Sequence, residues 1–202
     1  IRKDGFIVRL GLFDGVSKLK FSGHEIGLGS IAYKVLTDPH ITKIFHNGVY
    51  DLDWLQNGYG IPIKGRCEDT MTRAYLLNAY AGHYDLDSCA IREGIEGKNK
   101  DYTIDQWWKD HGGKGKAIEH MDEIPTPIVD KYLDGDLQVT WNLFHAQAPK
   151  LTEERLDEAN DREVRLYPLL MEMKKNGIRI DWAARDRLSD KLTQEYEQGI
   201  QR

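Results

Sequence analysis

The chain has few of the residues that mark several large classes of protein. Its 202 residues include only two cysteines, Cys67 and Cys89, whose spacing fits neither a disulfide framework nor a structural zinc site. No apolar run approaches the roughly 20 residues that a membrane span needs, and we find no secretory signal. These absences argue against small secreted scaffolds and membrane proteins, so we expect a reduced, cytoplasmic protein.

An excess of basic charge is also missing. The formal net charge of -5 argues against a protein that coats nucleic acid by bulk electrostatics. It does not exclude a metal-dependent nuclease, because the metal site of such an enzyme is itself a cluster of carboxylates. The length and the 40% share of hydrophobic residues suffice for one full core and a small appendage.

The most informative stretch is residues 42–55, which predicts a buried strand that turns directly into a helix. Asn47 is predicted to cap this helix, and Leu52 and Leu55 fall on one helical face. Asp51 is therefore expected one turn into a helix, close to the end of a strand.

Strand-like and helix-like patterns alternate along the rest of the chain. They predict a β-hairpin over residues 5–22 that turns at Asp14-Gly15, a strand over 65–68, and helices over 26–37, 71–80, 86–95, 126–148 and 151–176. Asp69 is interpreted as the cap of the second of these helices rather than as a third metal ligand. Pro149 is predicted to end the fourth helix and Pro168 to interrupt the fifth. A short strand over 178–180 then precedes a last helix capped by Asp181.

Residues 96–126 form a polar excursion with weak helical signals. We hypothesise that this excursion borders the path of single-stranded DNA, with Lys114, Lys116 and Trp107 as contacts, because lysines attract phosphates and an exposed indole can stack on a base. The alternative is a solvated insertion that its tryptophans pin to the core.

Two motifs combine a carboxylate with helical spacing. Asp51 lies in the helix after the strand, and Asp136 follows Tyr132 by four residues in the helix over 126–148. Residues four apart share a helical face, so the Tyr132 hydroxyl and the Asp136 carboxylate can point into one cleft. Carboxylates from two helices could hold a divalent metal ion, with the phenol directed toward a water that the metal activates.

The order of these motifs carries a resemblance to a known family. The order is Asn47, Asp51, Asp69-Thr70, Tyr132 and Asp136. It resembles the second and third motifs of the DEDDy 3′-5′ exonucleases, specifically the proofreading domain of family A (DNA polymerase I-like) DNA polymerases of phage type. The run from Leu169 to Asp181 is similar to the segment by which such polymerases pass from exonuclease to polymerase domain, so the resemblance covers essentially the whole chain.

The resemblance implies an α/β protein with a ribonuclease H-like exonuclease fold, a mixed sheet flanked by helices, followed by a small helical segment. Residues 1–150 would be the exonuclease domain, and residues 151–202 the helical connection and the beginning of the polymerase domain. Two divalent metal ions, Mg²⁺ or Mn²⁺, would support hydrolysis of the 3′-terminal phosphodiester and release of a deoxynucleoside monophosphate. The implied partners are the single-stranded 3′ primer end and the remainder of a polymerase chain, in the host cytoplasm if a phage encodes it.

The resemblance also assigns roles to residues. Asp51 and Asp136 would bind the metal ions, and Tyr132 would orient the nucleophilic water. Asn47 and Leu55 match positions that contact the terminal nucleotide or pack beneath it. His46 is placed with them on the substrate side, with a turn residue satisfied by the backbone as the simpler interpretation.

The first motif of the family, Asp-x-Glu, is missing, because Asp4 and Asp14 each lack a glutamate two residues on. We expect that its strand lies upstream of Ile1, and that these 202 residues alone bind metal weakly and are inactive. Two alternatives stay open. One is a non-catalytic exonuclease-like module that binds DNA or serves as a scaffold for the polymerase, and the other is a ribonuclease D-like RNA 3′-exonuclease.

Overall fold

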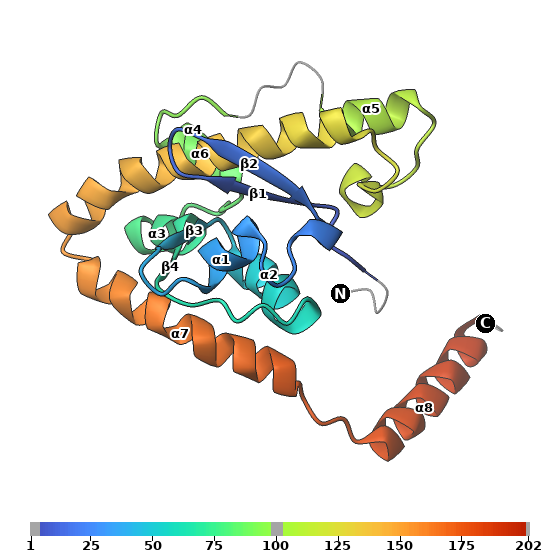
Figure 1. Ribbon diagram of the computed structural model, residues 1–202. Coiled ribbons are helices and arrows are strands. Elements are labelled where there is room, and N and C mark those ends of the chain that lie inside the picture. The colour runs from blue at the N-terminus through green and yellow to red at the C-terminus, as the bar shows by residue number, and fades with distance from the viewer. Residues whose placement is uncertain (1–4, 98–102, 201–202) are drawn as a thin grey trace. The chain divides into compact units, whose positions relative to one another are not determined.

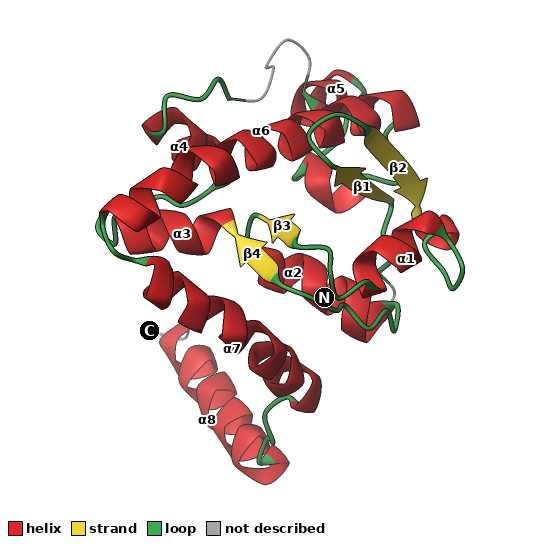
Figure 2. Cartoon of the chain, turned by 60° about the vertical axis from the view of Figure 1, so that its left-hand side comes forward, coloured by secondary structure: helices red, strands yellow, loops and turns green. Residues whose placement is uncertain are grey.

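The computed structural model describes residues 5–97 and 103–200 (Figures 1 and 2). The strands are β1 (Arg9–Phe13), β2 (Lys18–Ser22), β3 (Lys43–Phe45) and β4 (Cys67–Asp69). The helices are α1 (Ile31–Thr37), α2 (Gly48–Asp53), α3 (Thr70–Leu77), α4 (Leu86–Arg92), α5 (Ile104–Asp110), α6 (Thr126–Glu153), α7 (Asp157–Asn176) and α8 (Trp182–Ile200), with shorter helical turns at 23–25, 54–58 and 117–120. The chain divides into two compact units, residues 1–171 and residues 172–202. The functional boundary expected at residue 150 stays a prediction.

The hairpin of β1 and β2 forms as predicted, although β1 begins at Arg9 and not at Gly5. Asp14 Oδ1 accepts the backbone N–H groups of Val16 at 2.9 Å and Ser17 at 2.6 Å, which closes the turn. Gly15 has a φ of +94°, a conformation that favours glycine, and a Cβ there would lie 2.5 Å from the ring of Trp141 in α6.

The parallel pair of β3 and β4 brings two strand-to-helix junctions side by side. Phe45 pairs with Asp69, and each strand leads within three residues into a helix, α2 or α3. The expectation of one mixed sheet is wrong for the described residues, because the four strands form two separate two-stranded sheets (Figure 2). No strand in the described ranges pairs with both β1 and β3, and a sheet is continuous only where neighbouring backbones share hydrogen bonds.

Two prolines do not stop their helices, contrary to the prediction. Pro149 lies inside α6, and Pro168 lies inside α7. A proline in a helix costs one backbone hydrogen bond, but burial of Leu151 and Tyr167 close to these prolines offsets that loss. The chain turns instead at Arg155, whose φ is +58°.

Near helix α1 and before helix α8, the structure differs in part from the predictions. Helix α1 begins at Ile31 and not at residue 26, because the Ser30 side chain accepts the N–H of Tyr33 and caps it there. Residues 178–180 do not form a strand, since no described strand pairs with them. Asp181 caps α8 as predicted, with its Oδ1 accepting the N–H of Ala184 at 3.0 Å.

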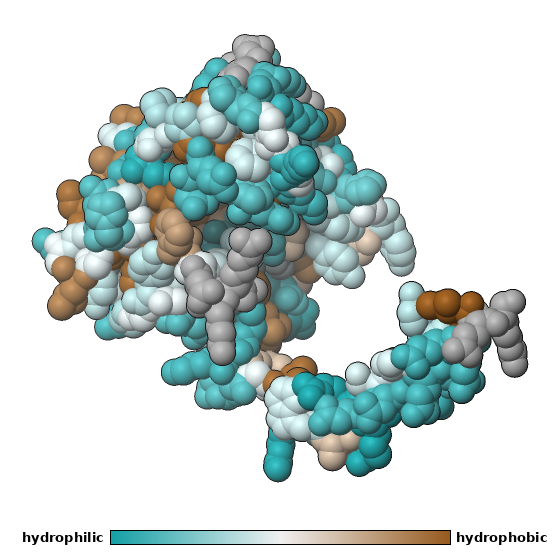
Figure 3. Space-filling view, turned by 90° about the vertical axis from the view of Figure 1, so that its right-hand side faces the viewer, coloured by the Kyte–Doolittle hydropathy of each residue, from teal (hydrophilic) through white to brown (hydrophobic). Residues whose placement is uncertain are grey.

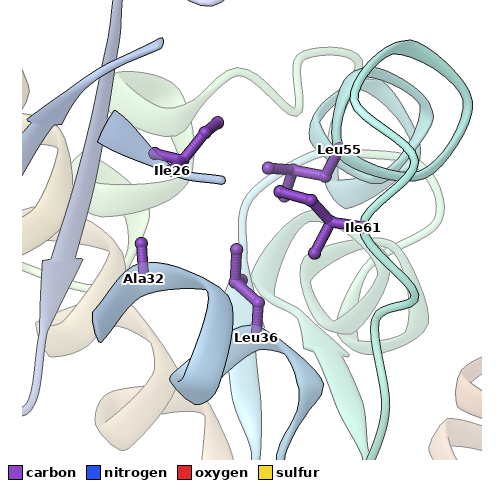
Figure 4. Packing of buried hydrophobic residues seen from close by; sticks show 5 residues of the cluster. All are labelled: Ile26, Ala32, Leu36, Leu55 and Ile61. Atoms are coloured by element: carbon purple, nitrogen blue, oxygen red, sulfur yellow. The ribbon is translucent and has the colours of Figure 1, made fainter. Parts of the chain in front are cut away.

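A buried apolar cluster joins the residues that follow β2 to α1, to the helical turn at 54–58 and to the loop after that turn (Figure 4). Its members are Ile26, Ala32, Leu36, Leu55 and Ile61. Helix α6 crosses the hairpin (Figure 1) and is held by ion pairs of Arg9 with Asp130 and of Lys20 with Asp134, each at 2.7 Å. These contacts fix the rotation of α6, the helix that carries Tyr132 and Asp136.

The surface mixes hydrophilic groups with scattered hydrophobic ones (Figure 3). Among the described residues of the second unit, α8 exposes Trp182, Leu188, Leu192, Tyr196 and Ile200. Of the helices in residues 5–97 and 103–200, none is long and apolar enough to cross a membrane.

Candidate active site

Asp69, at the end of β4, holds the start of two helices at once. It is only 2% exposed. Its Oδ1 accepts the N–H of Met71 at 2.7 Å, which is the predicted cap of α3, and the N–H of Asn47 at 3.1 Å. Its Oδ2 accepts the N–H of Gly48 at 2.6 Å. One carboxylate therefore satisfies backbone donors at both helix N-termini, where its negative charge is also favoured by the helix dipoles.

Asn47 occupies the cap position of α2, but its side chain makes no capping hydrogen bond. Its backbone is left-handed, with φ +61° and ψ +46°, and Asp69 supplies the capping oxygens from the neighbouring strand. The prediction of a capping asparagine is thus right in position and wrong in mechanism. The side chain of Asn47 stays exposed at the first turn of α2.

Asp51 lies in the first turn of α2, where the charges of two further carboxylates act on it. Desolvation by the surrounding protein, followed by the negative charges of Asp69 and Asp136, raises the pKa of Asp51 from 3.8 to about 7. The residue nevertheless keeps exposed surface, so a solute can reach it. Two neighbouring carboxylates thus oppose the ionisation of Asp51, and a bound cation would favour its ionised form.

Helix α6 brings Asp136 into electrostatic range of Asp51 and of His46. Tyr132, one turn earlier, is half-buried and packs on a cluster of Ile104, Ala117, Ile124 and Val129. Within the described ranges, no group of three or more histidine, cysteine, aspartate or glutamate side chains has the arrangement of a complete metal site. The assignment of Asp51, Asp136 and Tyr132 to catalysis stays a prediction.

His46 is held by the protein on both sides of its ring. Nδ1 lies 2.9 Å from the Thr70 hydroxyl and Nε2 lies 3.0 Å from the Tyr84 carbonyl oxygen. Burial lowers the pKa of His46, against the opposing effect of the charge of Asp69, so the ring is neutral near pH 7. Because a carbonyl only accepts, Nε2 carries the proton and donates to Tyr84, while Nδ1 faces the Thr70 hydroxyl, which also donates to the Phe45 carbonyl at 3.1 Å. Both ring nitrogens of His46 thus have partners within the protein, one of them a backbone carbonyl, and its assignment to the substrate side stays a prediction.

The remaining predicted contacts are Leu55, Trp107, Lys114 and Lys116. Leu55 is 1% exposed and belongs to the apolar cluster of Figure 4, which leaves it a packing role. Trp107 is half-buried and stacks on His111 at 4.0 Å, while Lys114 and Lys116 are exposed. Trp107 also packs against the buried cluster of Ile104, Ala117, Ile124 and Val129, as the alternative of an insertion pinned by its tryptophans expects, and the DNA contacts stay a prediction.

Sequence reasoning missed the buried polar side chains that support Asp69 and its neighbour Glu68. Tyr167 donates its hydroxyl to Asp69 Oδ2 at 2.5 Å from a position 98 residues later. Glu68 pairs with Arg73 at 2.9 Å and accepts from Asn160 at 3.0 Å. No local pattern links Tyr167 or Asn160 to residues more than 90 positions earlier, so no signal in the sequence could have revealed these two partners.

The raised pKa of Asp51 predicts a pH-dependent stability of the metal-free chain. The folded-state pKa of about 7 exceeds the ordinary 3.8, so the folded state binds more protons between these values and the free energy of unfolding falls as pH rises through them. We expect Asp51→Asn to stabilise the chain by about 1 kcal/mol at pH 8, after allowance for solvent screening, and to have little effect at pH 4. Urea unfolding at the two pH values measures this.

The control is Asp122→Asn, which changes an exposed aspartate in the same unit in the same way. It should alter the free energy of unfolding by less than about 0.5 kcal/mol at either pH. Equal effects of the two substitutions on the free energy of unfolding at pH 8 would contradict the unfavourable ionisation of Asp51 in the folded state.

The chain is similar to known proteins over most of its length. A family described as 3′-5′ exonuclease matches residues 12–152. DNA polymerase I of Pseudomonas aeruginosa is 30% identical over 150 residues, which cover 73% of this chain and 16% of that protein. DNA polymerase DpoZ of Acinetobacter phage SH-Ab 15497 is 28% identical over 150 residues, which cover 73% of this chain and 24% of the relative.

A shorter stretch is similar to a different kind of protein. Exosome complex component 10 of Homo sapiens is 36% identical over 72 residues, which cover 36% of this chain and 8% of that protein. The chain spans about a quarter or less of the length of these three relatives.

Proposed function

Because the chain belongs to the 3′-5′ exonuclease family, which matches residues 12–152, we propose that it is the proofreading exonuclease portion of a family A DNA polymerase of phage type. The substrate is a mismatched single-stranded 3′ primer end, and the product is a deoxynucleoside monophosphate. The proposal includes a ribonuclease H-like fold, with residues 1–150 as the exonuclease domain and residues 151–202 as the connection toward the polymerase.

The single observation that carries this proposal is the match of the 3′-5′ exonuclease family to residues 12–152. The surroundings of Asp51 agree with it, because its carboxylate is reachable by solutes, yet the surrounding protein and then the negative charges of Asp69 and Asp136 oppose its ionisation. Hard oxygen donors of this kind suit Mg²⁺ or Mn²⁺, and a divalent cation would restore the ionised state. The residues therefore fit the divalent metal ions that the family implies, with Asp51 and Asp136 as the ligands.

In the proposed mechanism, each side chain has a separate task. The metal ions, when bound, supply charge that activates water and stabilises the negative charge that develops on the scissile phosphate. Asp51, in the first turn of α2, and Asp136, within α6, would hold these ions. Tyr132 directs its hydroxyl toward the attacking water and sets its orientation. Asp69 keeps the start of α2 in place, and the exposed side chain of Asn47 is available to the terminal nucleotide.

A test of the function uses the full-length gene product that contains these residues. With Mg²⁺ it should shorten 5′-labelled single-stranded DNA stepwise from the 3′ end, and a chelator should abolish the shortening. DNA bound but left intact would favour the non-catalytic alternative. Preferential shortening of an RNA of the same sequence would favour the ribonuclease D-like alternative, which the similarity to exosome complex component 10 keeps open.

The proposal extends to the path of the DNA along residues 103–126. The exposed Lys114 and Lys116 would contact phosphates there, close to the half-buried Trp107. We expect the double substitution Lys114→Ala and Lys116→Ala to weaken binding of single-stranded DNA and to reduce the slope of log affinity against log salt by about one unit per lost contact. Titrations at several salt concentrations measure this slope.

The control is Lys34→Ala, which removes an exposed lysine from α1. It should leave the slope unchanged. A double variant with the slope of the parent would show that Lys114 and Lys116 face only solvent.

A further inference from the structure

The hydroxyl of Tyr167 meets the carboxylate that holds the start of α2. Tyr167 lies in α7 and donates to Asp69 Oδ2 at 2.5 Å, and the same oxygen accepts the N–H of Gly48 at 2.6 Å. The tyrosine is 6% exposed and packs in a cluster with Leu52 of α2 and Cys67 of β4. Its ring thus contacts the helix that carries Asp51, while its hydroxyl contacts the anchor of that helix.

We propose that Tyr167 is a positioning residue of the exonuclease site, whose hydroxyl fixes Asp69 and through it the first turn of α2 that presents Asp51. This inference rests on the proposed function. Asp69 Oδ2 receives the phenol and one amide, so loss of the phenol would leave a buried carboxylate oxygen with a single strong donor. The carboxylate would then be free to reorient, and the amides of Asn47 and Gly48 would lose a fixed acceptor.

The hydroxyl of Tyr167 keeps its proton and therefore remains a hydrogen-bond donor. Burial, followed by the negative charge of Asp69, raises the pKa of Tyr167 far above its ordinary value. The hydroxyl therefore stays protonated wherever the protein is folded. A second hydroxyl, that of Thr72, lies 3.4 Å from the phenol oxygen and belongs to α3, so Tyr167 sits between both helices that Asp69 caps.

Further contacts fix α7 against β4, which it passes in Figure 1. Asn160 donates to Glu68 Oε2 at 3.0 Å, and Arg66 pairs with Asp161 at 2.6 Å. Helix α7 therefore contacts the consecutive strand residues Glu68 and Asp69. The geometry of the site depends on a helix that begins at Asp157, beyond residue 152 where the family match ends.

The test is Tyr167→Phe, which removes one hydroxyl and retains the packed ring. We expect backbone amide hydrogen exchange at Asn47 and Gly48 to become about tenfold faster, as for the loss of one charge-assisted hydrogen bond. Exchange in the β1–β2 hairpin should not change. The matched control is Tyr75→Phe in α3, whose parent side chain is 55% exposed, and it should leave both regions unchanged.

In the full-length gene product, Tyr167→Phe should lower the exonuclease kcat about three- to tenfold while KM and polymerisation stay the same. Unchanged exchange at Gly48, or equal acceleration at all amides, would overturn the proposal, because the latter indicates a general loss of stability. Absence of exonuclease activity in the parent would instead refute the proposed function. The exchange data report on the contact with Asp69 in either case, so the two failures are distinguishable.

Discussion

Asp136→Ala in the full-length gene product should reduce exonuclease activity by about a thousandfold or more. One carboxylate less at the site removes a ligand of the metal ions, whose charge is worth several kcal/mol to the transition state. Polymerisation should be nearly unaffected, because the substitution lies in α6, within the residues that the 3′-5′ exonuclease family matches. Stepwise shortening of 5′-labelled single-stranded DNA and primer extension measure the two activities in the same preparation.

The comparison variant is Tyr132→Phe, four residues earlier on the same helix. It removes a hydroxyl that orients water but binds no metal directly, so we expect a smaller loss of roughly a hundredfold. Equal losses in the two variants would show that Tyr132 does more than orient water. Retention of the parent rate by Asp136→Ala would refute the assignment of the site to Asp136.

Arg73→Ala should lower the free energy of unfolding by about 3 kcal/mol at pH 7. The side chains of Arg73 and Glu68 are only 7% and 4% exposed, and their ion pair measures 2.9 Å. Without the guanidinium, the buried carboxylate of Glu68 has fewer positively charged and hydrogen-bonding partners. The substitution also removes a cation–π contact between Arg73 and Phe144 at 4.0 Å. Arg66 and Asn160 still reach Glu68, which keeps the expected loss at the lower end of the range for a broken buried pair.

The pH dependence of this loss follows from Glu68. Burial alone would raise the pKa of Glu68, but hydrogen bonds from Asn160 and Arg66 and the charge of Arg73 together lower it below the ordinary 4.5. A lowered pKa stabilises the folded state above the unfolded-state pKa, and this stabilisation disappears as pH falls through the folded-state value. The difference in free energy of unfolding between the parent and Arg73→Ala should therefore become smaller at acidic pH.

Lys150→Ala is the control, because it breaks a 2.7 Å ion pair in which the lysine is 50% exposed and its partner Glu93 is 12% exposed. Solvent screens this pair from the lysine side, so we expect a loss of about 1 kcal/mol, well below that of Arg73→Ala. Urea unfolding of the three proteins across pH gives the comparison. If Arg73→Ala cost no more than Lys150→Ala at pH 7, the buried pair would contribute no more than a surface one.

Features decided by near neighbours could be predicted from the sequence. The turn at Asp14-Gly15, the cap of α3 by Asp69 and the cap of α8 by Asp181 each depend on hydrogen bonds that span at most three residues. Helical spacing also puts Tyr132 and Asp136 on one helix, and Asp51 one turn into another. The family to which the chain belongs followed from the order of these local motifs.

Predictions failed where distant parts of the chain compete with local preference. Pro149 and Pro168 disfavour a helix by their own chemistry, but both remain in helices beside the buried Leu151 and Tyr167. Asn47 has the side chain of a helix cap, yet Asp69 from the neighbouring strand takes that role. In each case, packing or hydrogen bonding outside the segment outweighs a local cost of a few kcal/mol.

The sequence by itself determined which carboxylates lie on which helices, because helix periodicity and caps act over three or four residues. Only the tertiary structure decided that Asp51, Asp69 and Asp136 share one electrostatic environment, since their charges act on one another through space. The same holds for Tyr167, which meets Asp69 across 98 positions. Such contacts depend on how β4, α6 and α7 pack, and that packing is a property of the whole compact unit rather than of any single segment.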